Sequence, residues 1–332
     1  MVLALPTLDV LRRSFPDAYI GYVVDERPRD LIAAHPAVDR VHFVPTLGWR
    51  RATASPTHWA RIGGEIRAFV RELRAERYDV ALDLQANAKG GVLALASGAP
   101  VRVGFGRRFS REGNHLFSTH HVELEQWPIH LVDKFLAAAA YLGADPRAAR
   151  FQVPEPGESR ERVEGFLREL VPGPYVVMHP GSSHRRPDKR WVTERFGQVA
   201  QRTLADHGLR TVVCYGPSER ALAESVVASS AGSAVLAAAS ASLLDLGALL
   251  RRSVLFVGTD SGPMHLAAAV GVPAVTLFGS GSPVLYGPHP STSPAHRVLF
   301  KPVQGRRGGM AAITVEEVQR AIDDSLRART AA

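Results

Sequence analysis

The chain has 332 residues, of which 45% are hydrophobic and 22% charged, with one cysteine and a formal net charge of +8. This length suits two globular domains, and a single cysteine excludes an intramolecular disulfide or a cysteine-based zinc site and indicates a reducing cytoplasm. The positive charge favours anionic ligands, but no motif or basic stripe typical of nucleic-acid binding accompanies it. No apolar run has the roughly 18 residues of a membrane-spanning helix, and the first residues lack a signal-peptide pattern.

Helical and strand patterns alternate along the first half of the chain. Hydrophobic periodicity predicts helices over residues 3–14, 61–77, 89–96 and 130–142, and strands over residues 19–24, 38–44 and 78–84. Such alternation is typical of βαβ units that build parallel sheets. The three histidines His115, His120 and His121 are interpreted as loop residues rather than a zinc site.

A turn-rich linker at residues 153–157 leads to the second half. That half starts at Tyr175 and gives five strand–helix units up to Phe278, followed by a helix over residues 314–327 that opens with a capping box, Thr314 and Glu317. The predicted fold class is therefore α/β with two Rossmann-like, doubly wound domains. We expect them to cover residues 1–155 and 156–332, with packing of the last helix back on the first domain left open.

One strand end carries a pattern suited to an anion. A buried strand at residues 254–258 is followed by Thr259-Asp260-Ser261-Gly262, and a helix then begins with His265 in its first turn. The backbone N–H groups and dipole of such a helix favour an anion, while Gly262 lets a ligand approach the backbone closely. Taken alone, the pattern is equally compatible with Asp260 and Ser261 acting only as helix caps.

A second strand end of the same kind lies upstream. The strand that starts at Tyr175 runs into a loop with Ser182 and Ser183, and Lys189 follows just before a helix. Because the carboxyl ends of parallel strands meet at one sheet edge, the two loops are expected to converge. Together they predict a diphosphate cradle.

These segments resemble the ADP-heptose:lipopolysaccharide heptosyltransferases, which form glycosyltransferase family 9. The resemblance covers nearly the whole chain in the right order, at residues 4–6, 11–18, 78–85, 102–105, 179–183 with 189–191, 259–269 and 278–279. It implies the GT-B arrangement, in which the two domains face each other across a cleft. It also implies glycosyl transfer from a nucleotide sugar with inversion at the anomeric carbon.

The resemblance assigns donor-binding roles in the second domain. Ser182, Ser183 and Lys189 would hold the diphosphate together with the helix at Ser261, Gly262 and His265, and Asp260 would accept hydrogen bonds from the donor sugar. Glu219 is a candidate for the ribose hydroxyls, and it is equally compatible with an ordinary first-turn helix residue. Because protein cations supply the positive charge, we expect neither a metal nor a cofactor.

Acceptor recognition is expected in the first domain. Lys89 follows a predicted strand where the family carries a basic residue, and Arg111 lies in a segment that the family uses for its anionic acceptor. A solvated basic loop is the alternative for Arg111. The resemblance implies a monomer in the cytoplasm of a Gram-negative bacterium, in peripheral contact with the inner membrane and its anionic glycolipid.

The start of the chain departs from the family pattern. A doubly wound domain normally opens with a strand, whereas here the first element reads as a helix. In the family a first strand ends in Gly-Asp shortly before the segment at residues 4–6, and that aspartate is the proposed general base. Counting back places it before Met1, and Asp9 is no substitute because it lies inside the first helix. We therefore expect a chain that lacks about fifteen residues and a front sheet without its central strand.

Two other classes remain open. A degenerate, non-catalytic homologue that binds a sugar nucleotide would account for the missing aspartate. A nicotinamide-dependent oxidoreductase also has Rossmann-like domains, but the glycine fingerprint is lacking because Gly104-Phe105-Gly106 is followed by Arg107-Arg108-Phe109.

Overall fold

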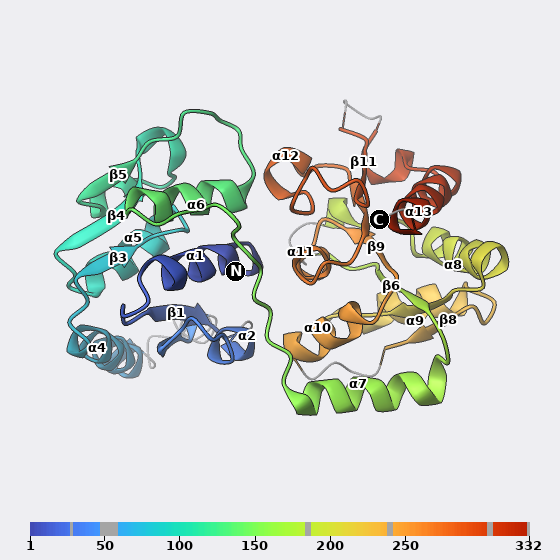
Figure 1. Ribbon diagram of the computed structural model, residues 1–332, viewed down its shortest axis with the longest axis horizontal. Helices are drawn as coiled ribbons and strands as arrows, with labels where there is room; N and C mark the ends of the chain where they lie inside the picture. Colours follow the sequence, from blue (N-terminus) through green and yellow to red (C-terminus); the bar gives the residue numbers. More distant parts are fainter. Residues whose placement is uncertain (27–28, 47–58, 183–186, 238–241, 304–307, 331–332) are drawn as a thin grey trace. The chain divides into compact units, whose positions relative to one another are not determined.

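The computed structural model describes residues 1–26, 29–46, 59–182, 187–237, 242–303 and 308–330 (Figure 1). It divides into two compact units: unit 1 comprises Met1 and Leu3–Gln152, and unit 2 comprises Val2 and Val153–Ala332. The boundary between them lies slightly before the one that the sequence indicates. Over the described ranges, none of the helices has the length and apolar character needed to cross a bilayer.

Unit 1 contains two separate parallel sheets. Strands β1 (Gly21–Asp25) and β2 (Arg40–Val44) form one, and β3 (Val80–Leu82), β4 (Val101–Phe105) and β5 (His120–Val122) form the other. Among the described residues no strand joins β1 to β3. His120 and His121 lie in β5, so their assignment to a loop was wrong, because this short edge strand has no alternating apolar pattern.

Short helices connect and cover these strands (Figure 1). They are η1 (Val2–Ala4), α1 (Leu5–Ser14), α2 (Arg29–Ala33), α4 (Trp59–Ala75), α5 (Ala88–Ala96), η3 (Arg107–Phe109), η4 (Asn114–Phe117) and α6 (Leu131–Tyr141). In α1, the buried carboxylate of Asp9 accepts hydrogen bonds from the Arg150 backbone N–H at 3.0 Å and from Nε2 of Gln152 at 2.6 Å. Asp9 therefore anchors the end of unit 1 and is not available as a base.

Unit 2 is built on one six-stranded parallel sheet in the order β11-β10-β9-β6-β7-β8. Its strands are β6 (Tyr175–His179), β7 (Arg210–Val213), β8 (Ala234–Leu236), β9 (Leu255–Thr259), β10 (Ala274–Phe278) and β11 (Arg297–Phe300). Every residue of β6, β9 and β10 is buried, as expected for parallel strands covered on both faces. The predicted α/β class is confirmed.

The helices of unit 2 are α7 (Gly157–Leu170), α8 (Thr193–His207), α9 (Arg220–Ala228), α10 (Leu243–Arg251), α11 (Gly262–Ala269), α12 (Pro283–Tyr286) and α13 (Val315–Thr330), with turns η5 (Pro187–Lys189) and η6 (Met310–Ala312). The sequence analysis did not identify α7, because only a narrow stripe of this charged helix is buried. The capping box at the start of α13 is confirmed: the Glu317 N–H donates to Thr314 Oγ1, and the Thr314 N–H donates to Glu317 Oε2.

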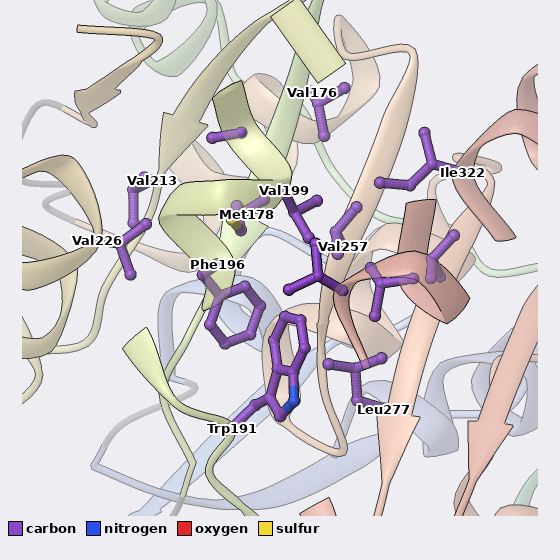
Figure 2. Close-up of a cluster of buried hydrophobic side chains, with 14 of the residues drawn as sticks. Val176, Met178, Trp191, Phe196, Val199, Val213, Val226, Val257, Leu277 and Ile322 are labelled. Carbon is purple, nitrogen blue, oxygen red and sulfur yellow. The ribbon is translucent and has the colours of Figure 1, made fainter. Parts of the chain in front are cut away.

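The core of unit 2 also fixes the last helix. Trp191 packs edge-on against Phe196 with ring centroids 5.0 Å apart, and its Nε1 donates to the Ile313 carbonyl at 3.0 Å (Figure 2). Val318 and Ile322 of α13 are fully buried in the same cluster. The apolar face of α13 is therefore used within unit 2.

Candidate functional site

The carboxyl ends of three neighbouring strands in unit 2 carry polar side chains. β9, β6 and β7 are adjacent in the sheet, and their chains continue into the loops at residues 260–261, 180–182 and 214–219. In open α/β sheets this edge is where ligands bind. We refer to the polar groups gathered here as the strand-end site.

Lys189 and Asp260 form an ion pair at the strand-end site. Lys189 ends the turn η5, Asp260 directly follows β9, and Nζ lies 2.5 Å from Oδ2. Their side chains are 18% and 8% exposed, so the pair is largely shielded from water. The two residues predicted to hold different parts of a ligand thus contact each other directly.

His179 links two further groups that the sequence did not connect. Its Nε2 lies 3.2 Å from Glu219 Oε2, and its Nδ1 lies 3.3 Å from Ser261 Oγ. His179 is the last residue of β6, and Glu219 directly precedes α9. His179 belonged to the recognised motif but not to the predicted site residues. The signal in the sequence that could have identified His179 as a site residue is a histidine at the end of a buried strand.

Glu219 is held in an ionised state by its neighbours. Burial is the largest influence on this carboxyl and opposes its ionisation. The hydrogen bond and charge of His179 and the Gly216 N–H, which donates to Glu219 at 3.0 Å, together outweigh burial and hold the pKa of Glu219 below its ordinary value. This carboxylate also lies over Gly181, where a Cβ atom would come within 2.4 Å of it. Glu219 therefore organises the loop after β6, and nothing in the structure tests its predicted contact with a ribose.

The loop after β6 is tied to β9 as well. Thr259 Oγ1, fully buried, donates to the Gly181 carbonyl at 2.6 Å. Ser182 is buried beside it with 3% exposure, while Ser183 lies outside the described residues. These contacts fix the backbone of the loop, so that its groups are set in place before a ligand arrives.

Helix α11 begins at the strand-end site. Ser261 occupies its N-cap position but makes no side-chain capping hydrogen bond, so the predicted capping role is wrong, and its hydroxyl faces His179 instead. Gly262 is exposed and His265 is half-buried in the first turn. Pro263 has no N–H, so Gly262 and Met264 supply the backbone donors of the first turn of α11 that can bind an anion, and Lys189 is the nearby cation.

Unit 1 has a corresponding polar cluster at its own strand ends. Lys89, in the first turn of α5, places Nζ 2.9 Å from Asp25 Oδ2 and 3.4 Å from Thr46 Oγ1. Burial is the largest single influence on Asp25 and raises its pKa. The hydrogen bonds from Thr46 and Lys89 together outweigh burial, so the pKa of Asp25 is lowered. Arg111 is exposed, and its backbone N–H donates to the Ala86 carbonyl at 2.9 Å. Lys89 thus lies at the start of the helix that follows β3, and Arg111 lies on the loop that follows β4.

Beneath those loops lies a buried network that the sequence analysis did not identify. Asp83 accepts hydrogen bonds from Asn114 Nδ2 at 2.6 Å and the Gln85 N–H at 2.8 Å. Lys134 donates to the Phe109 carbonyl at 2.7 Å and lies 4.2 Å from the centre of the Phe105 ring. Burial, with Arg111 nearby, lowers the pKa of Lys134 to about 8. The carboxylate of Asp83 is therefore engaged in holding its loop.

Known proteins that are similar in sequence and fold identify the family. The model of glycosyltransferase family 9 (heptosyltransferase) matches residues 66–299, and the chain belongs to this family. It is 28% identical over 289 residues to lipopolysaccharide heptosyltransferase 1 of Escherichia coli K12, covering 85% of each chain.

Solved structures agree with this assignment. The glycosyl transferase family 9 protein from Veillonella parvula aligns with a TM-score of 0.79 and 25% identity, covering 98% of this chain and 93% of its own. The E. coli heptosyltransferase WaaC with ADP aligns with a TM-score of 0.75 and 25% identity, covering 98% and 95%. WaaC has also been solved with ADP-2-deoxy-2-fluoro heptose. The protein is thus a glycosyltransferase.

Proposed function

We propose that this enzyme transfers a heptose, or a closely related sugar, from an ADP-sugar to the inner core of lipopolysaccharide, with inversion at the anomeric carbon. The observation that carries the proposal is the strand-end site, where Lys189 pairs with Asp260 and His179 contacts Ser261 at the start of α11. The family and the ADP bound to WaaC support a nucleotide sugar as the donor.

In this proposal the strand-end site stabilises the leaving diphosphate. Lys189 and the backbone N–H groups of α11 supply the positive charge that a departing ADP requires, and Ser182, Ser183 and His265 complete the cradle. Asp260 accepts hydrogen bonds from the sugar hydroxyls once Lys189 turns toward phosphate. Because protein groups provide this charge, the reaction is proposed to need neither a metal nor a cofactor.

The acceptor is proposed to bind at the strand ends of unit 1. Arg111 and Lys89 offer cations that suit the carboxylates and phosphates of an anionic glycolipid, and we propose that the enzyme acts as a monomer at the cytoplasmic face of the inner membrane. During transfer the acceptor hydroxyl loses its proton to a base as its oxygen bonds to the anomeric carbon and the bond to phosphate breaks. Both Asp83 and Asp25 accept hydrogen bonds within unit 1, but Asp83 is buried whereas the Asp25 side chain is 35% exposed, so Asp25 is the first described carboxylate to test as this base.

One experiment separates the proposed function from its alternatives. ADP, ADP-heptose and NAD are titrated calorimetrically into the full chain, and ADP release is then measured with heptose-deficient lipopolysaccharide as acceptor. Binding of ADP and ADP-heptose with ADP release supports the transferase. Binding without release supports a non-catalytic homologue, and preferential binding of NAD would overturn the proposal.

A further inference from the structure

His179 bridges a carboxylate and a hydroxyl at the strand-end site. Its Nε2 is 3.2 Å from Glu219 Oε2, and its Nδ1 is 3.3 Å from Ser261 Oγ. The His179 side chain is 4% exposed and the Glu219 side chain 13%, so water competes little for their contact. His179 therefore connects Glu219, directly ahead of α9, to Ser261 at the start of α11. We refer to these three side chains as the relay.

The contact with Glu219 determines which nitrogen of His179 carries hydrogen. Burial opposes ionisation of Glu219, but its hydrogen bonds hold its pKa below the ordinary value, so at neutral pH this group is an anion that only accepts hydrogen bonds. Nε2 of His179 is then the N–H donor. Because a neutral imidazole has a single N–H, its Nδ1 is an acceptor, and the Ser261 hydroxyl donates its hydrogen to that atom.

This use of the Ser261 hydroxyl differs from that of an ordinary N-cap serine. Such a serine accepts a hydrogen bond from a first-turn N–H with its side-chain oxygen, whereas Ser261 makes no side-chain capping bond and contacts His179 instead. While His179 is neutral, the one hydrogen of the hydroxyl is directed at the imidazole. A phosphate oxygen that arrives at the start of α11 then meets the lone pairs of the hydroxyl and not its hydrogen.

Protonation of His179 reverses this arrangement. A proton from solvent that adds to Nδ1 makes this atom a donor to Ser261 Oγ, and the hydroxyl hydrogen can then be donated to a phosphate oxygen. The imidazolium stays paired with the carboxylate of Glu219, which balances its charge in a poorly solvated place. An anion at the start of α11 favours the charged imidazole further. Histidine is the side chain that exchanges a proton near neutral pH.

Other charged and titratable groups surround the relay. Among the described residues they are Asp260 after β9, His265 in α11, Cys214 after β7, Lys189 at the end of η5 and Arg190 next to it. Lys189 and Asp260 pair with each other. Burial raises the pKa of Cys214 to about 12, so its thiol stays neutral, and Arg190 acts on Glu219 through its charge. Glu219 is therefore the carboxylate that balances an imidazolium at His179.

We propose that His179 is a positioning residue that couples binding of the donor's diphosphate to the uptake of one proton. In the free enzyme the neutral imidazole holds the Ser261 hydrogen, and with a diphosphate bound the imidazolium directs that hydrogen to a phosphate oxygen. As the bond between sugar and phosphate breaks, negative charge grows on the diphosphate that accepts this hydrogen bond. The inference deepens the proposed function and rests on it, since it concerns how the same site binds its donor.

Calorimetry of the full chain with ADP-heptose, in two buffers of different ionisation enthalpy, measures the proton uptake. A sugar diphosphate has no phosphate monoester that titrates near neutral pH, so a proton taken up goes to the protein. At slightly alkaline pH we expect about one proton per donor bound in the parent protein and in Ser261→Thr, which keeps the hydroxyl. Ser261→Ala and Glu219→Gln should each take up less than half as much.

A second histidine–carboxylate pair in unit 2 provides the matched control. His207, at the end of α8, lies 2.8 Å from Asp323 of α13. His207→Gln should take up as much proton on binding ADP-heptose as the parent protein, because this pair is not part of the relay. Equal proton uptake in the parent protein, Ser261→Ala and Glu219→Gln would overturn the proposal.

NMR of protein labelled in its histidine nitrogens observes the imidazole directly and needs no change at Ser261 or Glu219. The signals of His179 are assigned by their absence from the spectrum of His179→Gln. We expect a neutral ring with hydrogen on Nε2 in the free protein and an imidazolium with ADP-heptose bound. Hydrogen on Nδ1 in the free protein, or a neutral ring in the complex, refutes this inference while the proposed function stands. If ADP-heptose does not bind, both are wrong.

Discussion

Nζ of Lys189 lies 2.5 Å from Oδ2 of Asp260, and residues 71 positions apart in the chain are thereby paired at one sheet edge. The opposite charges of the two side chains neutralise each other before a ligand binds. In the proposed donor site, a diphosphate that binds Lys189 would draw it away from Asp260, and the freed carboxylate would accept hydrogen bonds from a neighbouring sugar, so that nucleotide and sugar binding would be coupled.

Replacement of Lys189 by alanine tests the cradle. We expect Lys189→Ala to weaken ADP binding by about 1.5–3 kcal/mol, the contribution of a hydrogen bond to a charged group, as measured by calorimetry. Lys301→Ala is a matched control, because Lys301 also pairs with a carboxylate, Glu317 at 2.7 Å, but follows β11. If both variants bind ADP like the parent protein, Lys189 does not contact the nucleotide.

Replacement of Asp260 by asparagine separates the nucleotide from the sugar. Asp260→Asn removes the negative charge that competes with phosphate for Lys189, so ADP binding should be retained or strengthened. The affinity for ADP-heptose should fall relative to the affinity for ADP, because the side chain expected to accept hydrogen bonds from the sugar is altered. Calorimetry with both ligands checks this expectation, and an equal loss of both would show that Asp260 supports the loop instead.

Glu219 should contribute to stability in a pH-dependent way. Because its pKa is lower in the folded state than its ordinary value of 4.5, its stabilising effect is present above that value and is lost as the pH falls through the folded pKa. Glu219→Gln should lower the melting temperature at pH 7. The difference in melting temperature between this variant and the parent protein should be smaller at pH 3. Glu224→Gln serves as control, since Glu224 is half-exposed and pairs with Arg220. If the difference in melting temperature between Glu219→Gln and the parent protein were the same at pH 7 and pH 3, the role assigned to Glu219 would be wrong.

Lys134 should make unit 1 more stable at alkaline pH. Its pKa is about 8 in the folded protein against 10.5 ordinarily, so between these values the unfolded state binds more protons and the free energy of unfolding rises with pH. The rise is on the order of 3 kcal/mol. Urea unfolding from pH 7 to pH 10 should show this rise in the parent protein relative to Lys134→Met. Identical pH profiles would mean that Lys134 titrates normally.

Local patterns in the sequence were sufficient for the elements that depend on neighbouring residues. The strand–turn–helix at β9 and α11 follows from an apolar run, a Gly-containing turn and an alanine-rich helix, and the capping box of α13 needs only Thr314 and Glu317. Alternating elements gave the α/β class. Helix α7 was missed because its apolar signal is spread thinly over a charged sequence.

The partners of the site residues were decided by tertiary structure alone. The sequence placed Lys189, Asp260 and Glu219 at strand ends, but each had several possible partners at the same sheet edge. Which atoms meet depends on the strand order β9-β6-β7, which brings His179 between Ser261 and Glu219. Hydrogen bonds act over about 3 Å, whereas a pattern in the sequence fixes the end of a strand only to within a residue or two. The sequence by itself thus determined the family, the fold and the edge where the site lies. The folded sheet determined which side chains pair there, because long-range contacts set those distances.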